Sequence, residues 1–325
     1  MSFLANENRR YFLIQSGAAL LGTGALAAGL RSDAADSAWN PILACRDTHL
    51  KDIGAADAWA AVKAIGASGV EVDVDIQLNC VNLFHPQKKY SLATSEALET
   101  LKKDAEQNGV KITAFCMHNQ FDRRPDEEVK WAAAMVNAAK ALNVKVIRVD
   151  FAPGKIKGDE YLPFAVSMGK RLVDLVKDTD IRYGIENHGN TTNRPEFLDK
   201  LFDGVGSKAL GLTLDTGNFY WYGHPLNDLY KIFEQYASRV FHTHCKSIRY
   251  PEEKRNTQRP MGWEYEKYTC PIYEGDIDFR KIISILKAAN YSGDFCVEDE
   301  SLGKFPKEKK GEILKKEIAF LQSLL

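Results

Sequence analysis

Four residues in the second half of the chain have side chains that could bind one metal ion together. Each lies at the end of a short, mostly apolar run, and they are Glu186, Asp215, His244 and Glu298. Three carboxylates and one imidazole form a mixed oxygen and nitrogen ligand set, which suits Mn²⁺, Mg²⁺ or Co²⁺ and also accepts Zn²⁺. Each residue alone has an ordinary structural explanation, such as a buried ion pair. Together they favour a site for one divalent metal ion.

Further polar side chains follow the same alternating pattern. His188 and Lys246 come two residues after Glu186 and His244, so in an extended chain they point to the same side. Either could stabilise an oxyanion or act as a base. The other polar residues in this phase are Glu71, Asp73, His118, Arg148 and Asp150. Buried polar groups without partners are costly, so this ring predicts a substrate pocket, with Glu71, His118 and Arg148 as candidate substrate contacts.

These residue types suit the chemistry of a proton next to a carbonyl group. A metal ion that binds a carbonyl oxygen and the neighbouring hydroxyl makes the C–H bond between them more acidic. A carboxylate on either face can then remove the proton and return it, which inverts a carbon or moves the carbonyl. Glu186 and Glu298 are the candidates for these two roles.

The elements that must position these residues alternate between two patterns from residue 40 onward. Short runs rich in β-branched residues predict strands at 42–46, 69–74, 111–118, 145–150, 181–188, 210–215, 239–246 and 294–298. Amphipathic runs between them predict helices at 55–67, 95–108, 125–142, 161–178, 195–202, 226–236, 279–289 and 307–324. Eight strands separated by helices indicate a parallel sheet.

Eight is also the number of strands that closes such a sheet into a (β/α)8 TIM barrel. The alternative is an open, doubly wound sheet, which favours a glycine-rich loop after its first strand. The segment from Ala44 to Thr48 contains no glycine. We therefore expect residues 36–325 to form one α/β barrel domain. A long polar insertion at 250–274, between the seventh strand and its helix, is typical of a lid over the active site.

The motifs around the metal-ligand candidates resemble the xylose-isomerase-like barrel superfamily, and within it the sugar phosphate isomerase and epimerase branch. The similar segments are Ile185-Glu186-Asn187, Leu214-Asp215-Thr216-Gly217-Asn218, His242-Thr243-His244-Cys245-Lys246, Val297-Glu298 and Gly275-Asp276-Ile277-Asp278-Phe279. The resemblance covers roughly residue 40 to the end of the chain. It implies that Glu186, Asp215, His244 and Glu298 bind the metal and that the two glutamates move the proton.

The chain departs from the ketose 3-epimerase pattern at positions that bind the substrate in that family. Thr192 occupies the position of a second glutamate, and Asn218 occupies the position of a histidine. Arg249 matches the arginine after the metal-binding histidine only with a shift of one residue. Asn218 and Arg249 therefore remain candidate substrate contacts, while the departures leave the reaction open.

Three further functions compete with an isomerase or epimerase that acts on a sugar or sugar derivative. A metal-dependent lyase that eliminates from a 3-keto-glycoside begins with the same acidified C–H bond. A repair endonuclease of this superfamily would need more histidines than the chain has, and the net charge of −1 disfavours nucleic-acid binding. A carbohydrate-binding protein without catalysis would not need two glutamates beside the metal. The expected partner is a small carbohydrate, and a homodimer is compatible with the resemblance.

The first 35 residues have a different composition from the rest. Arg9 and Arg10 precede a weakly hydrophobic run that is rich in alanine and glycine, as in a twin-arginine export signal. No second apolar span follows. We therefore expect export to the periplasm without a stable membrane span in the mature chain. Cys80 and Cys270 fall in loop-like stretches, and the sequence leaves open whether they form a disulfide.

Overall fold

The structure, a computed structural model, describes residues 39–325, so the predicted export signal lies outside the described residues. Eight parallel strands close into a barrel in the order β1-β12-β9-β8-β7-β6-β5-β2. They are β1 (Ile42–Arg46), β2 (Gly69–Asp73), β5 (Lys111–Cys116), β6 (Val146–Val149), β7 (Arg182–Glu186), β8 (Leu210–Asp215), β9 (Val240–Cys245) and β12 (Asp294–Val297). The predicted (β/α)8 barrel is thus confirmed.

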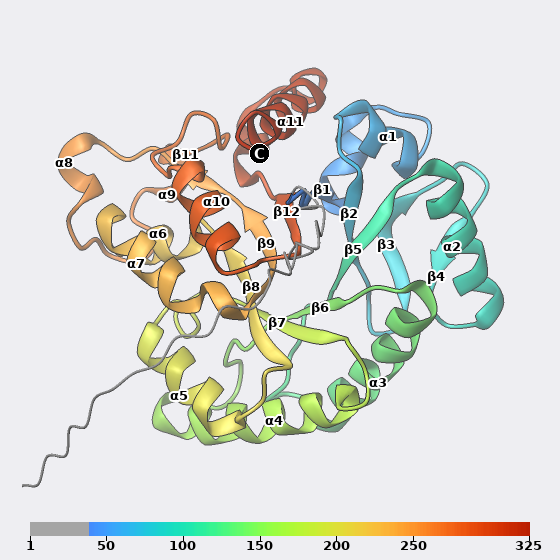
Figure 1. Cartoon of the computed structure of the whole chain (residues 1–325), viewed down its shortest axis with the longest axis horizontal. Coiled ribbons are helices and arrows are strands. Elements are labelled where there is room, and N and C mark those ends of the chain that lie inside the picture. Colours follow the sequence, from blue (N-terminus) through green and yellow to red (C-terminus); the bar gives the residue numbers. More distant parts are fainter. Residues whose placement is uncertain (1–38) are drawn as a thin grey trace, which may run out of the picture. The chain divides into compact units, whose positions relative to one another are not determined.

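Helices surround this barrel in the expected alternation (Figure 1). The principal ones are α1 (Ala58–Ala64), α2 (Ser95–Asn108), α3 (Pro125–Leu142), α4 (Tyr161–Val176), α5 (Pro195–Val205), α7 (Leu226–Tyr236), α10 (Phe279–Ala288) and α11 (Lys307–Gln322). Their ends follow from local chemistry. The Thr94 side chain accepts a hydrogen bond from the Ala97 backbone at the start of α2, and Gly109 ends that helix at a φ of 66°.

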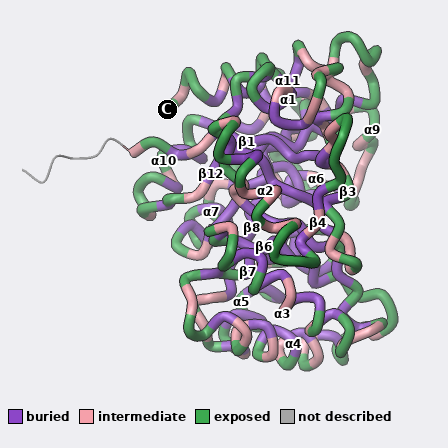
Figure 2. The backbone as a smooth tube through the Cα atoms, turned by 90° about the vertical axis from the view of Figure 1, so that its right-hand side faces the viewer, coloured by how far each residue is buried: buried purple, intermediate pink, exposed green. Residues whose placement is uncertain are grey.

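The core lies between the strands and the helices (Figure 2). Along each strand, the residues that alternate with the polar ring are apolar and fully buried, for example Val70, Val149, Ile185, Leu214 and Val297. Their side chains point outward from the barrel to the helices, because successive residues of a strand face opposite sides. The polar ring consequently faces the barrel interior.

Several short elements were not predicted. The antiparallel pair β3 (Asn79–Phe84) and β4 (Lys89–Ser91) lies between β2 and α2, and β10 (Ser247–Ile248) pairs with β11 (Thr269–Cys270). Cys80 and Cys270 therefore lie in two-stranded ladders rather than in loops. Both are free thiols in the structure.

The insertion between β10 and β11 contains the short helices α8 (Glu252–Arg255) and α9 (Tyr265–Tyr268). It packs on α6 (Asn218–Tyr222), where the Arg259 guanidinium lies 4.4 Å from the ring centres of both Tyr220 and Tyr250. The same guanidinium donates to the Tyr220 and His224 carbonyl oxygens. The insertion is therefore an ordered part of the barrel's rim, and its function as a lid stays a prediction.

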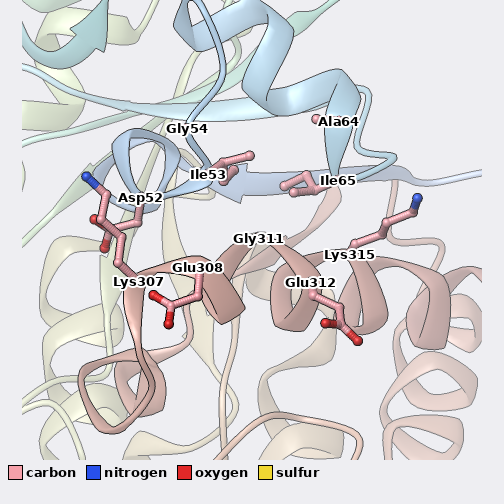
Figure 3. Close-up of a pocket in the computed structure, with 10 residues that line it drawn as sticks. All are labelled: Asp52, Ile53, Gly54, Ala64, Ile65, Lys307, Glu308, Gly311, Glu312 and Lys315. Atoms are coloured by element: carbon pink, nitrogen blue, oxygen red, sulfur yellow. The ribbon is translucent and has the colours of Figure 1, made fainter.

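A groove on the outside of the barrel separates α11 from α1 and from the 3-10 helix η1 (Asp47–Ile53) (Figure 3). Its lining includes Ile53, Ile65 and Gly311 and none of the residues of the polar ring. Among residues 39–325, no helix has the length and apolar character needed to cross a membrane.

Candidate metal centre and active site

The four predicted metal ligands meet at the carboxyl ends of β7, β8, β9 and β12. One donor atom from each of Glu186, Asp215, His244 and Glu298 lies within 4.8 Å of the others. All four side chains are buried. Adjacent parallel strands bring them together, because their carboxyl ends share one rim of the barrel.

The unused donor atoms of this cluster fit a divalent cation. Asp215 Oδ2, His244 Nδ1 and Glu298 Oε2 are buried and make no directed hydrogen bond, although the Lys246 ammonium lies near both oxygens. The His244 Nδ1 atom lies 3.1 Å from Glu298 Oε2 and 3.5 Å from Glu186 Oε1. Buried polar atoms without partners are strongly unfavourable. A cation bound among them would satisfy all of these atoms.

Glu71 orients the imidazole of this cluster, although the sequence suggested a substrate contact. It is fully buried and lies behind His244, with Oε2 at 2.8 Å from His244 Nε2. Burial disfavours its charge, but His244 and Arg46 hold the pKa of this carboxyl well below its usual range. Because the carboxylate engages Nε2, the Nδ1 atom of His244 is left to face the cluster.

Two buried arginines hold the two glutamates. Arg148 donates from Nε to Glu186 Oε2 at 2.7 Å and from Nη1 to Asp150 at 2.6 Å. Its guanidinium is buried and engaged by Glu186, Asp150 and the Met117 carbonyl oxygen, so it positions Glu186. Arg46 pairs in the same way with Glu298 and, at 2.5 Å, with Asp73.

The electrostatics of the glutamates and of Asp215 differ. Burial opposes the charge of Glu186 and Glu298, yet the pKa of each is lowered by neighbouring cations, Arg148 for Glu186 and Lys246 for Glu298, together with His244. Burial raises the pKa of Asp215 to about 7, and the charges of Glu298 and Glu186 add to the effect against that of Lys246. Without a metal, Asp215 is therefore the carboxyl among these three that holds a proton most readily.

Lys246 joins the cluster from its position just after β9. Its Nζ lies 2.9 Å from Asp215 Oδ2, 3.1 Å from Glu298 Oε2 and 2.8 Å from Glu300 Oε1. Burial disfavours the ammonium charge, but these three carboxylates raise the pKa of Lys246 well above its usual value. The structure thus places a cationic donor beside the metal ligands.

Two histidines lie at the exposed rim of the site. His188 and His118 have side chains that are 54% and 59% exposed. His188 Nδ1 lies 3.3 Å from Asp150 Oδ1, and this contact raises the pKa of His188. His118 Nε2 lies 3.5 Å from Asp73 Oδ1. Both imidazoles are accessible to a substrate, as a substrate contact or a base would need to be.

The structure treats the last two candidate substrate contacts differently. Asn218 is buried and donates from Nδ2 to Glu186 Oε1 at 3.1 Å, while its backbone N–H donates to Asp215 Oδ1. It therefore supports two metal-ligand candidates. The Arg249 side chain is exposed, and within residues 39–325 it makes no hydrogen bond or ion pair with the cluster.

Sequence reasoning missed Arg46 and Glu300. Both follow the same alternation as the ring, since Arg46 ends β1 and Glu300 comes two residues after Glu298. The periodicity was thus a signal for both. Arg46 was not chosen as a site residue because the alternation alone gives no reason to expect an arginine beside a metal ion.

Comparisons with known proteins agree with the barrel fold. The family model described as "Xylose isomerase-like TIM barrel" matches residues 59–324. An inosose dehydratase from Clostridium perfringens (strain 13) is 28% identical over 224 residues, which cover 62% of this chain and 74% of that protein.

Two solved structures share the fold. A xylose isomerase-like TIM barrel protein from Mycobacterium smegmatis, in complex with magnesium, has a TM-score of 0.64 and 16% identity, covering 88% of this chain and 97% of that one. The IOLI protein, with a bound zinc atom, has a TM-score of 0.63 and 17% identity, covering 87% and 99%. With a family model that spans most of its length and eight strands closed in the expected order, this chain belongs to the xylose isomerase-like TIM barrel family.

Proposed function

We propose that this protein is a metal-dependent isomerase or epimerase that acts on a sugar or sugar derivative. Membership of this family is consistent with an enzyme of sugar metabolism. The observation that carries the finer proposal is the placement of two glutamates beside His244 Nδ1. Glu186 and Glu298 each direct one oxygen into the cluster, and each is also held by a buried arginine.

The ligand set of Glu186, Asp215, His244 and Glu298 fits one divalent ion, and the oxygen ligands favour Mn²⁺, Mg²⁺ or Co²⁺, with Zn²⁺ also accepted. When bound, such an ion would polarise a substrate carbonyl and acidify the neighbouring C–H bond. Glu186 and Glu298 then remove a proton from one face of that carbon and return one to the other face or to the adjacent carbon. Lys246 donates a hydrogen bond to the oxygen that gains negative charge.

A second candidate function is elimination from a keto sugar or a related ring. Two observations favour it. The relative from Clostridium perfringens is named a dehydratase, and the exposed His188 and His118 each lie near a buried carboxylate. In this reaction one imidazole takes the proton from the carbon next to the carbonyl. The C–O bond at the β-carbon then breaks, and the other imidazole gives a proton to the departing oxygen.

The two reactions are distinguished by NMR in D₂O with metal-loaded protein and a panel of free sugars, inososes and 3-keto-glycosides. An isomerase or epimerase introduces deuterium at the carbon next to the carbonyl and keeps every other bond. A lyase releases water or an aglycone. If saturation by a sugar is measured without exchange or product, the enzymatic proposal is wrong and a carbohydrate-binding protein is favoured.

We also propose that the protein is exported by the twin-arginine route. The proposal is supported by Arg9-Arg10 and the Ala- and Gly-rich run that follows.

A further inference from the structure

The insertion at 250–274 is connected to Lys246 by one chain of side-chain contacts. The Tyr265 hydroxyl in α9 donates to Glu300 Oε2, and Lys246 Nζ donates to Glu300 Oε1 at 2.8 Å. Glu300 is the first residue of the 3-10 helix η4 (Glu300–Lys304), two residues after the metal-ligand candidate Glu298. Glu300 therefore links the insertion to the cationic donor of the site through its two carboxylate oxygens.

The backbone connects the same parts. Lys246 directly precedes β10, whose Ser247 and Ile248 pair with Cys270 and Thr269 of β11, at the far end of the insertion. Figure 1 shows the insertion running from α8 through α9 to β11 along one side of the barrel. A change in the position of α9 would consequently be transmitted to Lys246 by a short and direct path.

The contacts of Lys246 indicate what Glu300 does. Of the three carboxylates around its Nζ, Asp215 and Glu298 are metal-ligand candidates. Their nearest oxygens, Asp215 Oδ2 and Glu298 Oε2, form ion pairs with Lys246 but no directed hydrogen bond. These two oxygens belong to the fitted ligand set, so Glu300 is the one partner of Lys246 among the described residues that has no other task in the site. A lysine side chain has many rotamers, and fixing it costs conformational entropy unless a partner holds it.

We propose that Glu300 and Tyr265 are positioning residues that aim the Lys246 ammonium at the substrate. In this arrangement Tyr265 fixes the Glu300 carboxylate and Glu300 fixes Lys246. The insertion thereby supplies part of the active site, rather than only covering it. This inference rests on the proposed function, in which Lys246 donates to the substrate oxygen that gains charge.

The test uses the full-length, metal-loaded protein with the variants Tyr265→Phe and Glu300→Ala and the double variant. Each single change should lower kcat about 10-fold, the worth of one hydrogen bond to a charged group, with KM and metal content unchanged. Because both residues act through Lys246, the double variant should lose no more than the worse single variant. Glu300→Gln, which keeps an oxygen acceptor, should recover part of the loss.

A matched control separates positioning from simple attachment of the insertion. Lys304, also in η4, donates from Nζ to the carbonyl oxygens of Thr269 at 2.6 Å and Lys267 at 3.1 Å. Lys304→Met removes this attachment of the insertion but keeps all three side chains of the path, Tyr265, Glu300 and Lys246. Any loss of kcat should therefore be much smaller than that of Tyr265→Phe. A loss in Lys304→Met equal to that in Tyr265→Phe would overturn the proposal.

A second readout does not depend on the reaction. Lys246 is 3% exposed, and its acylation by acetic anhydride is followed by mass spectrometry with the exposed Lys267 as internal reference. Tyr265→Phe and Glu300→Ala should accelerate the labelling of Lys246 to a similar and non-additive extent. Unchanged labelling in both variants would show that Tyr265 and Glu300 do not hold Lys246, whatever reaction the enzyme catalyses. Faster labelling with unchanged kcat would refute the positioning role and leave the proposed reaction intact.

Discussion

At the scale of single residues, every metal-ligand candidate is held by at least one neighbouring side chain or backbone group. Glu71 holds His244, Arg148 and Asn218 hold Glu186, and Arg46 holds Glu298. The side chain of Asp215 accepts from the Gly217 and Asn218 backbone N–H groups at 2.8 and 2.7 Å. Such supports fix ligand geometry in advance, which strengthens metal binding and reduces the reorganisation needed for catalysis.

The two glutamates can be tested separately from metal binding. Glu186→Gln and Glu298→Gln keep an oxygen for coordination but remove the basic carboxylate. If either moves the proton in the slow step, its variant should lose roughly 10²–10⁴-fold in turnover. Metal content is measured beside turnover for each variant. Near-normal turnover in both would exclude the two-carboxylate mechanism, and a severe loss in His188→Ala would then identify the lyase.

The pKa of Asp215 predicts how metal binding depends on pH. Burial raises this pKa to about 7, so in the metal-free protein the carboxyl must lose a proton before it can bind a cation. Affinity should therefore increase as the pH rises from about 6 to about 8. By the same linkage, the metal-free protein should lose stability as the pH rises from the ordinary pKa of an aspartate through about 7, because over this range the folded protein holds a proton that the unfolded chain has lost. Titration calorimetry at three pH values measures the affinity. Denaturant unfolding of the metal-free protein measures the stability, and Asp215→Asn should remove the part of its pH dependence that this carboxyl causes.

At the scale of elements, the close packing of strands makes particular glycines necessary. A Cβ atom on Gly211 in β8 would lie 2.1 Å from the Arg239 carbonyl oxygen and 2.5 Å from the Phe241 ring. Neither backbone nor ring can move away without disturbing β9.

We accordingly expect Gly211→Ala to lower the free energy of unfolding by about 2 kcal/mol or more, as overpacked sites do. Gly303→Ala is the matched control, because a Cβ atom there meets nothing within 4 Å. Denaturant unfolding of both variants gives the difference. Equal midpoints would show that the contact between β8 and β9 is looser than the structure has it.

The sequence was most informative about the long, periodic elements. The eight barrel strands were predicted within a few residues of their ends, because buried parallel strands give long apolar runs. The β3–β4 pair and β10–β11 were missed. β4, β10 and β11 have only two or three residues and carry too little periodicity to be recognised, and the six residues of β3 do not alternate regularly between polar and apolar side chains. The same limit applies to the site. Alternation identified Glu71 and Arg148 as inward-facing, but only the structure shows that their side chains end on metal-ligand candidates.

At the scale of the whole molecule, the proposed export signal can be tested independently of the barrel and its site. If Arg9 and Arg10 direct translocation, replacing both by lysine should retain the protein in the cytoplasm, because the export machinery reads the arginine pair. Cell fractionation with immunoblotting measures the distribution. Replacing Lys51 and Lys63, which lie in the described barrel, by arginine is the control and should leave export unchanged. Undiminished periplasmic accumulation of the Arg9→Lys, Arg10→Lys variant would contradict the signal.

The central claim is that Glu186, Asp215, His244 and Glu298 bind one divalent metal ion, and elemental analysis of purified protein tests it most directly. The protein should contain one ion per chain. Asp215→Asn and His244→Ala should lose it or bind it far more weakly, since even the loss of a supporting residue typically costs about 10–100-fold in affinity. His85→Ala is the control, because His85 lies outside the cluster, where its ring accepts from the Gln87 backbone N–H and packs against Tyr90. Full metal content in both cluster variants, or none in the unaltered protein after loading, would contradict the account.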